Sequence, residues 1–144
     1  MDQRSPQEYL ARCHCGSLSA CYRTAVAVSA WNVRACQCSF CRAHDALSIS
    51  DPAGSLEFTA LRPEHVQRYR FGSGQTDFLI CRQCGVYVGA RLTSEPVGII
   101  NALALTPIAT KLPAAQPMDY TGESGSDKRA RRTARWTPLT ASSL

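Results

Sequence analysis

Apolar and polar residues alternate along several short stretches of the chain, as they do in β-strands that bury one face. The clearest case follows Pro6, where Leu18, Ala20 and Tyr22 alternate with polar neighbours. Gly16 lies just before this stretch and predicts a turn between two strands. The pattern therefore predicts a β-hairpin near the N-terminus.

Further stretches have strand-like patterns and are separated by turn-forming pairs such as Asp51-Pro52 and Arg62-Pro63. They are residues 25–34, in which Trp31 and Val33 alternate, then 47–50, 55–60, 66–71, a hairpin over 77–92 with residues 81–85 at its tip, and the apolar run 97–105. Many short strands with little helix predict a mainly β protein.

Two segments have helical character. Residues 34–47 predict a loop that leads into one or two helical turns. A proline-rich connection, residues 107–117, precedes a predicted helix over 127–136, with Ser126 able to cap it and Pro138 ending it. At 144 residues, we expect a single domain over 1–144, in which residues 118–144 form a C-terminal tail with this helix.

Composition favours a soluble protein in a reducing compartment. The apolar fraction is 44%, and no apolar run approaches the roughly 20 residues of a membrane span. The first residues are polar and lack the apolar block of a signal peptide, so we expect a cytoplasmic location. Eight cysteines in that setting favour metal binding or thiol chemistry over disulfides.

The net charge of +5 comes from the predicted helix, because residues 128–135 contain five basic residues and no acidic one. Such a stretch can bind phosphates. The alternative is a solvated helix that Ala130 and Ala134, four residues apart, seat on the body of the protein. We favour the second interpretation, and a nucleic-acid partner is not expected.

Seven of the eight cysteines fall into three closely spaced groups: Cys13 and Cys15, then Cys36, Cys38 and Cys41, then Cys81 and Cys84. The first and third groups are each followed by glycine, which lets the backbone turn sharply behind a pair of ligands. C-x-C and C-x-x-C pairs both present two sulfurs to one tetrahedral zinc ion. The two pairs together therefore predict a closed, structural four-thiolate zinc site.

The middle group supplies three thiolates and so predicts a zinc site with one open position, which is typical of catalytic zinc. A fourth ligand would close it, and the nearest candidates are His44 and Asp45. An iron–sulfur cluster is a weaker alternative, because the spacing does not match the usual run. Cys21 could also serve as a ligand, but its place among alternating residues favours a small core residue.

An arginine accompanies each cysteine group: Arg12, Arg34, Arg42 and Arg82. A zinc ion with three or four thiolates carries a net negative charge, which these cations could offset. They could also bind an anionic substrate. The alternative, for each arginine considered alone, is an ordinary surface residue.

The segments CHCG (13–16), CQCSFC (36–41) and CRQCG (81–85), in this order and spacing, resemble the glutathione-dependent formaldehyde-activating enzyme family, whose domain the centromere protein V group shares. The resemblance covers most of the chain. It implies a zinc-containing β-tent fold of bent antiparallel sheets, with structural zinc on the first and third cysteine groups. It also implies a catalytic zinc on Cys36, Cys38 and Cys41.

The activity that the resemblance implies is a zinc-dependent carbon–sulfur lyase or synthase reaction, joining glutathione to formaldehyde as S-hydroxymethylglutathione. An all-thiolate zinc is a weak Lewis acid, so activation of the glutathione thiol is the preferred role for the middle site. The alternative hypothesis is a non-catalytic, zinc-stabilised β scaffold that binds a protein or nucleic acid through the basic helix.

Overall fold

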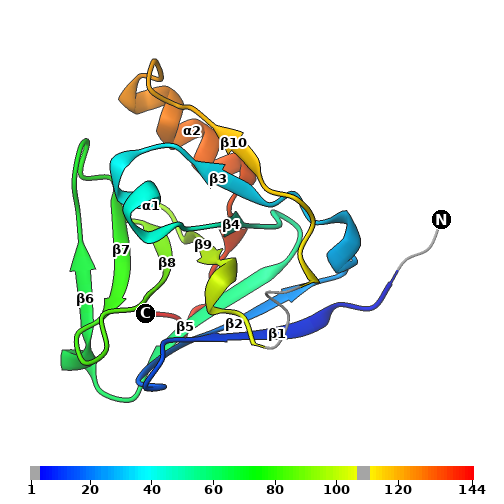
Figure 1. Cartoon of the computed structure of the whole chain (residues 1–144), viewed down its shortest axis with the longest axis vertical. Helices are drawn as coiled ribbons and strands as arrows, with labels where there is room; N and C mark the ends of the chain where they lie inside the picture. The colour runs from blue at the N-terminus through cyan, green and yellow to red at the C-terminus, as the bar shows by residue number, and fades with distance from the viewer. Residues whose placement is uncertain (1–3, 107–110) are drawn as a thin grey trace.

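A computed structural model of the chain describes residues 4–106 and 111–144. In this part of the chain, strands of two sheets make up most of the regular structure, and α1 and α2 are the α-helices. The prediction of a mainly β fold is therefore confirmed. The ribbon outlines a triangle, with β1, β2 and β5 along its lower side, β6–β8 at the left, and β3, β10 and α2 along the top (Figure 1).

The smaller sheet contains β1 (Gln7–Arg12), β2 (Leu18–Thr24) and β5 (Ser55–Ala60), paired antiparallel in the order β1-β2-β5. The β1–β2 turn passes through Gly16 with φ of +84°, a conformation that favours glycine, so the predicted hairpin is confirmed. Leu18, Ala20 and Tyr22 are buried on one face of β2. Cys21 lies on the other face and is only half-buried, so its assignment as a core residue was wrong.

The larger sheet has the order β10-β3-β4-β9-β8-β7-β6, with β11 also paired to β9. Its pairings are antiparallel except for the parallel pair β3–β10. The strands are β3 (Arg34–Cys36), β4 (Ser48–Ile49), β6 (Val66–Tyr69), β7 (Thr76–Cys81), β8 (Tyr87–Leu92), β9 (Val97–Asn101), β10 (Gln116–Met118) and β11 (Thr137–Pro138).

Both faces of the larger sheet are buried at β7, β8 and β9, which explains why β9 is an almost continuous apolar run. Successive residues of a strand point to opposite faces. One face contributes Leu79, Val88 and Ile100 to the core shared with the smaller sheet. The other face contributes a second cluster, which also contains residues from α1 and the end of α2: Cys41, Phe78, Tyr87, Ile99 and Trp136.

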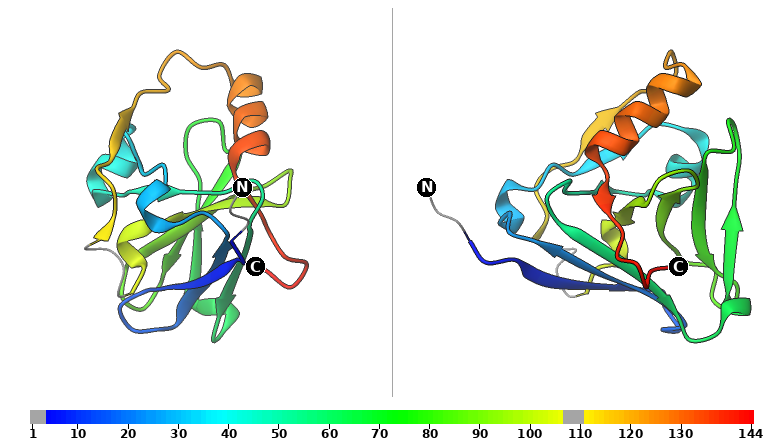
Figure 2. Two further views of the ribbon diagram at one scale, coloured as in Figure 1. Left: turned by 90° about the vertical axis from the view of Figure 1, so that its right-hand side faces the viewer. Right: turned by 180° about the vertical axis from the view of Figure 1, so that it is seen from behind.

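The helices are α1 (Ser39–His44) and α2 (Gly125–Arg135), and α2 lies at one end of the molecule (Figures 1 and 2). The Ser124 side chain caps α2 by accepting a hydrogen bond from the Asp127 amide (3.1 Å), so the helix begins earlier than predicted and Ser126 is not the cap. Among the described residues, no helix has the length and apolar character needed to cross a membrane.

The face that α2 turns toward the body is not the predicted one. Ala130 and Ala134 are exposed, whereas Lys128, Arg131 and Arg132 are half-buried at the i, i+3, i+4 spacing of one helix face. The helix is therefore seated through its basic side chains, and the interpretation based on the alanines was wrong. Long basic side chains can pack their methylene stems on apolar surface while their charged heads reach a polar space.

Two predicted strands differ from the observed ones, because each gives way to a single 3-10 turn. Residues 28–30 form the turn η1, and β3 starts only at Arg34, although Trp31 and Val33 are both buried as the alternation indicated. The run from residue 97 leaves the sheet after Asn101, whose side chain accepts from the Leu103 amide and caps the turn η3 (Ala102–Ala104). A third turn, η2 (Pro63–His65), precedes β6. Residues 107–110 of the predicted proline-rich connection lie outside the described part of the chain.

The contact between the two sheets predicts a strong effect of Gly89→Ala. A Cβ at Gly89 would clash with the Ile99 carbonyl oxygen and lie 2.7 Å from the Phe58 ring. Because a backbone atom cannot move aside cheaply, we expect the free energy of unfolding to fall by about 1–3 kcal/mol in urea denaturation. Gly122→Ala is the control, since nothing lies within 4 Å of its Cβ position, and equal stabilities for the two variants would contradict this packing.

Candidate metal centres and the adjoining cavity

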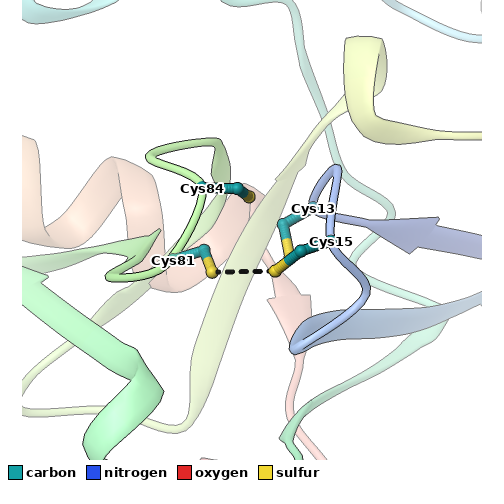
Figure 3. A group of neighbouring side chains, drawn as sticks. All are labelled: Cys13, Cys15, Cys81 and Cys84. Carbon is teal, nitrogen blue, oxygen red and sulfur yellow. Dashed lines mark hydrogen bonds between the residues drawn. The ribbon is translucent and has the colours of Figure 1, made fainter.

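Four thiols meet where two hairpin turns from different sheets approach each other (Figure 3). Cys13 and Cys15 come from the β1–β2 turn of the smaller sheet, and Cys81 and Cys84 from the β7–β8 turn of the larger one. All four sulfurs lie within 4.8 Å of one another. The structure thus brings together the four residues that the sequence predicted as one site.

The spacing of these sulfurs fits a tetrahedral metal ion. The Sγ atoms of Cys13 and Cys15 are 3.7 Å apart, and those of Cys15 and Cys81 are 3.6 Å apart. Four sulfurs placed about 2.3 Å from a zinc ion would be separated by roughly 3.8 Å. The four thiols could therefore hold such an ion with little movement, and all eight cysteines of the chain are free thiols.

Backbone amides donate to thiols of this cluster and favour their ionised form. The amides of Leu18 and Gln83 donate to the sulfurs of Cys13 (3.2 Å) and Cys81 (3.3 Å). The Ser17 hydroxyl, hydrogen-bonded to Cys15, lowers the pKa of Cys15 to about 6, whereas burial raises the pKa of Cys13 to about 11. A metal ion would ionise all four, because thiolates are the ligating form.

The second cluster consists of Cys36, Cys38 and Cys41, whose sulfurs also lie within 4.8 Å of one another. Cys36 ends β3, Cys38 caps the N-terminus of α1 by accepting from the Cys41 amide (3.4 Å), and Cys41 lies in the first turn of α1. The strand-to-helix junction is therefore what turns the three thiols toward one point.

No fourth ligand joins these three within the described residues. His44 packs its ring against Phe40 (4.5 Å between centroids) and Tyr87 (5.7 Å), and it is not part of the cluster. Asp45 is exposed and forms the left-handed C-cap of α1, and Cys21 lies on the smaller sheet. In this part of the chain the second cluster thus offers a metal ion three protein ligands.

The three thiols differ in acidity. A hydrogen bond from Cys41 and the positive charge of Arg132 help to lower the pKa of Cys36 to about 5. The same pairing with Cys36, together with burial, raises the pKa of Cys41 above its usual range.

A cavity of about 400 Å³ opens beside this cluster and is lined by all three of its cysteines. Arg34 lines it from β3, and Lys128, Arg131 and Arg132 line it from α2. Asp119, Tyr120 and Thr121 contribute from the connection between β10 and α2, and the remaining apolar lining comes from Phe71, Phe78, Ile99 and Trp136. The basic helix is thus one wall of a cavity that has a thiol cluster on another.

Three of the four cations have no carboxylate partner within 4 Å in the described part of the chain: Arg34, Lys128 and Arg132. Arg34 donates to Ser50 Oγ (2.7 Å) and Arg132 to Thr76 Oγ1 (2.5 Å), both neutral. Burial lowers the pKa of both guanidinium groups, which means that it disfavours their charged forms. Arg131 differs, because it forms a two-pronged ion pair with Glu123 (2.9 and 3.0 Å).

Two buried donors near the thiols also lack a hydrogen-bond partner: the Tyr87 hydroxyl and the Arg132 Nε. Burial, followed by the charges of Cys41 and Cys38, raises the pKa of Tyr87 well above its usual value. A buried donor without an acceptor is costly. Both observations favour an anionic group, thiolate or ligand, in this region.

Sequence reasoning identified the cysteines but only one of the four cations that line the cavity. Among the four arginines considered, Arg34 lines the cavity, while Arg12, Arg42 and Arg82 are exposed and do not. It missed Lys128, Arg131 and Arg132 as cavity residues. The available signal was their i, i+3, i+4 spacing, which puts three cations on one helix face.

No protein-family model matches the chain, and no curated protein matches it significantly. A crystal structure of a Rhodobacter sphaeroides protein, determined as a structural genomics target, is similar to this chain with a TM-score of 0.61 and 24% sequence identity. The similarity covers 76% of this chain and 99% of that chain. It shows a shared fold alone.

The metal content of cysteine variants should show that the two clusters bind metal independently. We expect two metal ions per chain in the purified protein, and one in each of Cys84→Ser and Cys38→Ser. Only Cys84→Ser should lower the melting temperature strongly, because its cluster joins two sheets whereas Cys36, Cys38 and Cys41 come from one local segment. Metal analysis and thermal denaturation provide the two measurements.

Cys21→Ser is the matched control, since Cys21 is half-buried and belongs to neither cluster. It should keep both metal ions. Loss of both ions in Cys38→Ser would contradict the independence of the two clusters. An unchanged melting temperature in Cys84→Ser would contradict a structural role for the four-thiol cluster.

Proposed function

We propose that this protein is a zinc-dependent carbon–sulfur lyase or synthase that acts on the glutathione adduct of a small aldehyde. The observation that carries the proposal is the three-thiol cluster at the wall of a cavity rich in cations. The resemblance of the three cysteine segments to glutathione-dependent formaldehyde-activating enzymes, with their β-tent fold, points to the same chemistry.

Zinc suits both clusters, because thiolate sulfur is a preferred zinc ligand, and the sulfur spacing in the four-thiol cluster matches tetrahedral geometry. In this proposal Cys13, Cys15, Cys81 and Cys84 hold a structural ion, and Cys36, Cys38 and Cys41 hold a catalytic one. The catalytic ion, with a position left for substrate, would hold the glutathione thiol in its nucleophilic thiolate form.

The cations that line the cavity suit glutathione, which carries two carboxylates and one ammonium group. Arg34, Lys128 and Arg132 can each receive a carboxylate. Asp119, which follows β10 and also lines the cavity, offers an acceptor for the ammonium group. These contacts would orient the peptide so that its sulfur lies at the cysteine cluster.

In the synthase direction, the sulfur of glutathione forms a bond to the carbonyl carbon while the carbonyl π-bond breaks. The proton lost from the thiol is restored on the resulting oxygen, so the product is a hemithioacetal and no oxidant or reductant is needed. The chain contributes by holding the two reactants at one place and by covering them with apolar side chains that limit access of water.

The scaffold hypothesis has less support. A helix that binds nucleic acid must present its basic side chains to solvent. Here Lys128, Arg131 and Arg132 are turned to the cavity, and Arg131 is already paired with Glu123. Arg129 and Arg135 are the basic residues of this helix that are exposed.

The proposal predicts that Lys128→Gln weakens glutathione binding about three- to tenfold, because one charge-assisted contact to a carboxylate is lost. Arg129→Gln is the matched control: it removes the same charge from the neighbouring, exposed position and should leave binding unchanged. Calorimetry gives the affinities. Exchange NMR at equilibrium gives the rate of adduct formation with formaldehyde above the uncatalysed background.

Cys38→Ser should remove that rate while the fold is kept. A wild-type protein that is loaded with zinc, yet neither binds glutathione nor exceeds the background rate with any aldehyde, would contradict the proposed function. An equal loss of affinity in Lys128→Gln and Arg129→Gln would instead show that the cavity wall is not the binding surface.

A further inference from the structure

We infer that the aldehyde part of the substrate carries an apolar group, aromatic or branched alkyl, rather than being formaldehyde itself. This rests on the proposed function and specifies its substrate class. The inference comes from the chemistry of the apolar residues that line the cavity together with the cysteines.

The three-thiol cluster is embedded in apolar side chains. Cys41 belongs to the same buried cluster as Phe78, Ile99 and Trp136, and Cys36 and Cys38 pack against that cluster. Phe78, Ile99 and Trp136 are also exposed to the cavity, since they line it together with the three cysteines. A carbon atom bonded to a sulfur at this cluster would therefore have hydrocarbon neighbours.

Stacked aromatic rings make this wall rigid. Phe40, between Cys38 and Cys41 in the chain, has its ring centroid 4.5 Å from that of Phe78 and 5.5 Å from that of Phe71. The rings of Phe71 and Phe78 are stacked at 4.9 Å with an interplanar angle of 29°. Offset stacking of this kind stabilises aromatic pairs and provides a flat face against which another ring can pack.

Phe71 completes the wall from the connection between β6 and β7. It is half-buried and lines the cavity at the start of a bend that contains Gly72 and Gly74 at φ of +59° and +70°. This bend turns the chain back into β7, where Phe78 lies. The β6–β7 hairpin therefore supplies both Phe71 and Phe78 to the cavity wall.

The cationic and the apolar lining residues come mostly from different elements, although Trp136 ends α2 and lies under the Arg132 guanidinium (4.9 Å to the ring centroid). Lys128, Arg131 and Arg132 come from α2, whereas Phe71, Phe78 and Ile99 come from the β6–β7 hairpin and β9. A glutathione adduct fits this division with its carboxylates toward α2 and its aldehyde-derived group toward the hairpin. A one-carbon group would leave the apolar side in contact with water, in a cavity of about 400 Å³ that can hold a larger ligand.

The test compares two stable adduct mimics, S-methylglutathione and S-benzylglutathione, by calorimetry on the zinc-loaded protein. We expect S-benzylglutathione to bind at least about tenfold more tightly, as is typical when an apolar pocket is filled. Phe71→Ala should reduce this ratio several-fold. Tyr69→Ala is the matched control, because Tyr69 also packs near Phe71 (5.8 Å) but does not line the cavity.

The wild-type comparison needs no variant, so it decides the inference even if Phe71→Ala is unstable. Equal binding of the two mimics, or tighter binding of S-methylglutathione, would overturn the inference and leave the proposed function standing. Failure of both mimics and of glutathione itself to bind would overturn the proposed function as well. A ratio that Phe71→Ala leaves unchanged would show that the preference arises elsewhere and would contradict the aromatic wall.

Discussion

The meeting of the β1–β2 and β7–β8 turns is the constraint on which the rest of the structure depends. Four thiols from these turns lie within 4.8 Å of one another, and the Ser17 hydroxyl donates to Gln83 Oε1 (2.7 Å) across the same junction. A metal ion there would tie two sheets that are distant in the chain. It would also set the position of β7 and β8, because Cys81 is the last residue of β7.

The larger sheet connects this junction to the three-thiol cluster. One of its faces packs on the smaller sheet, and the other face, through Phe78 and Tyr87, supports the three-thiol cluster. Neighbouring residues of one strand thus serve different purposes: Leu79 holds the sheets together while Phe78 lines the cavity. The core between the sheets and the cavity therefore lie on opposite sides of the same strands, and the four-thiol cluster is complete without the three-thiol cluster.

The sequence allowed both thiol clusters to be predicted, because short cysteine spacings determine locally how sulfurs can share one ion. It also predicted β5 to the residue, since alternation in a half-buried strand is a local signal. The inward face of α2 was missed because Ala130 and Ala134 look like contact residues until the charged space under the helix is known. Similarly, η3 replaces a strand only because Asn101 caps it, a competition that apolar content alone does not reveal.

The central claim is that Cys36, Cys38 and Cys41 hold a zinc ion with one position open for a substrate thiol. X-ray absorption at the zinc edge tests it directly on the wild-type protein. Without glutathione, the account predicts about 3.5 sulfur ligands per zinc, the mean of a four-thiolate and a three-thiolate site, and addition of glutathione should raise this to about 4. Four sulfurs per zinc from the start, or a lower count that glutathione leaves unchanged, would contradict it.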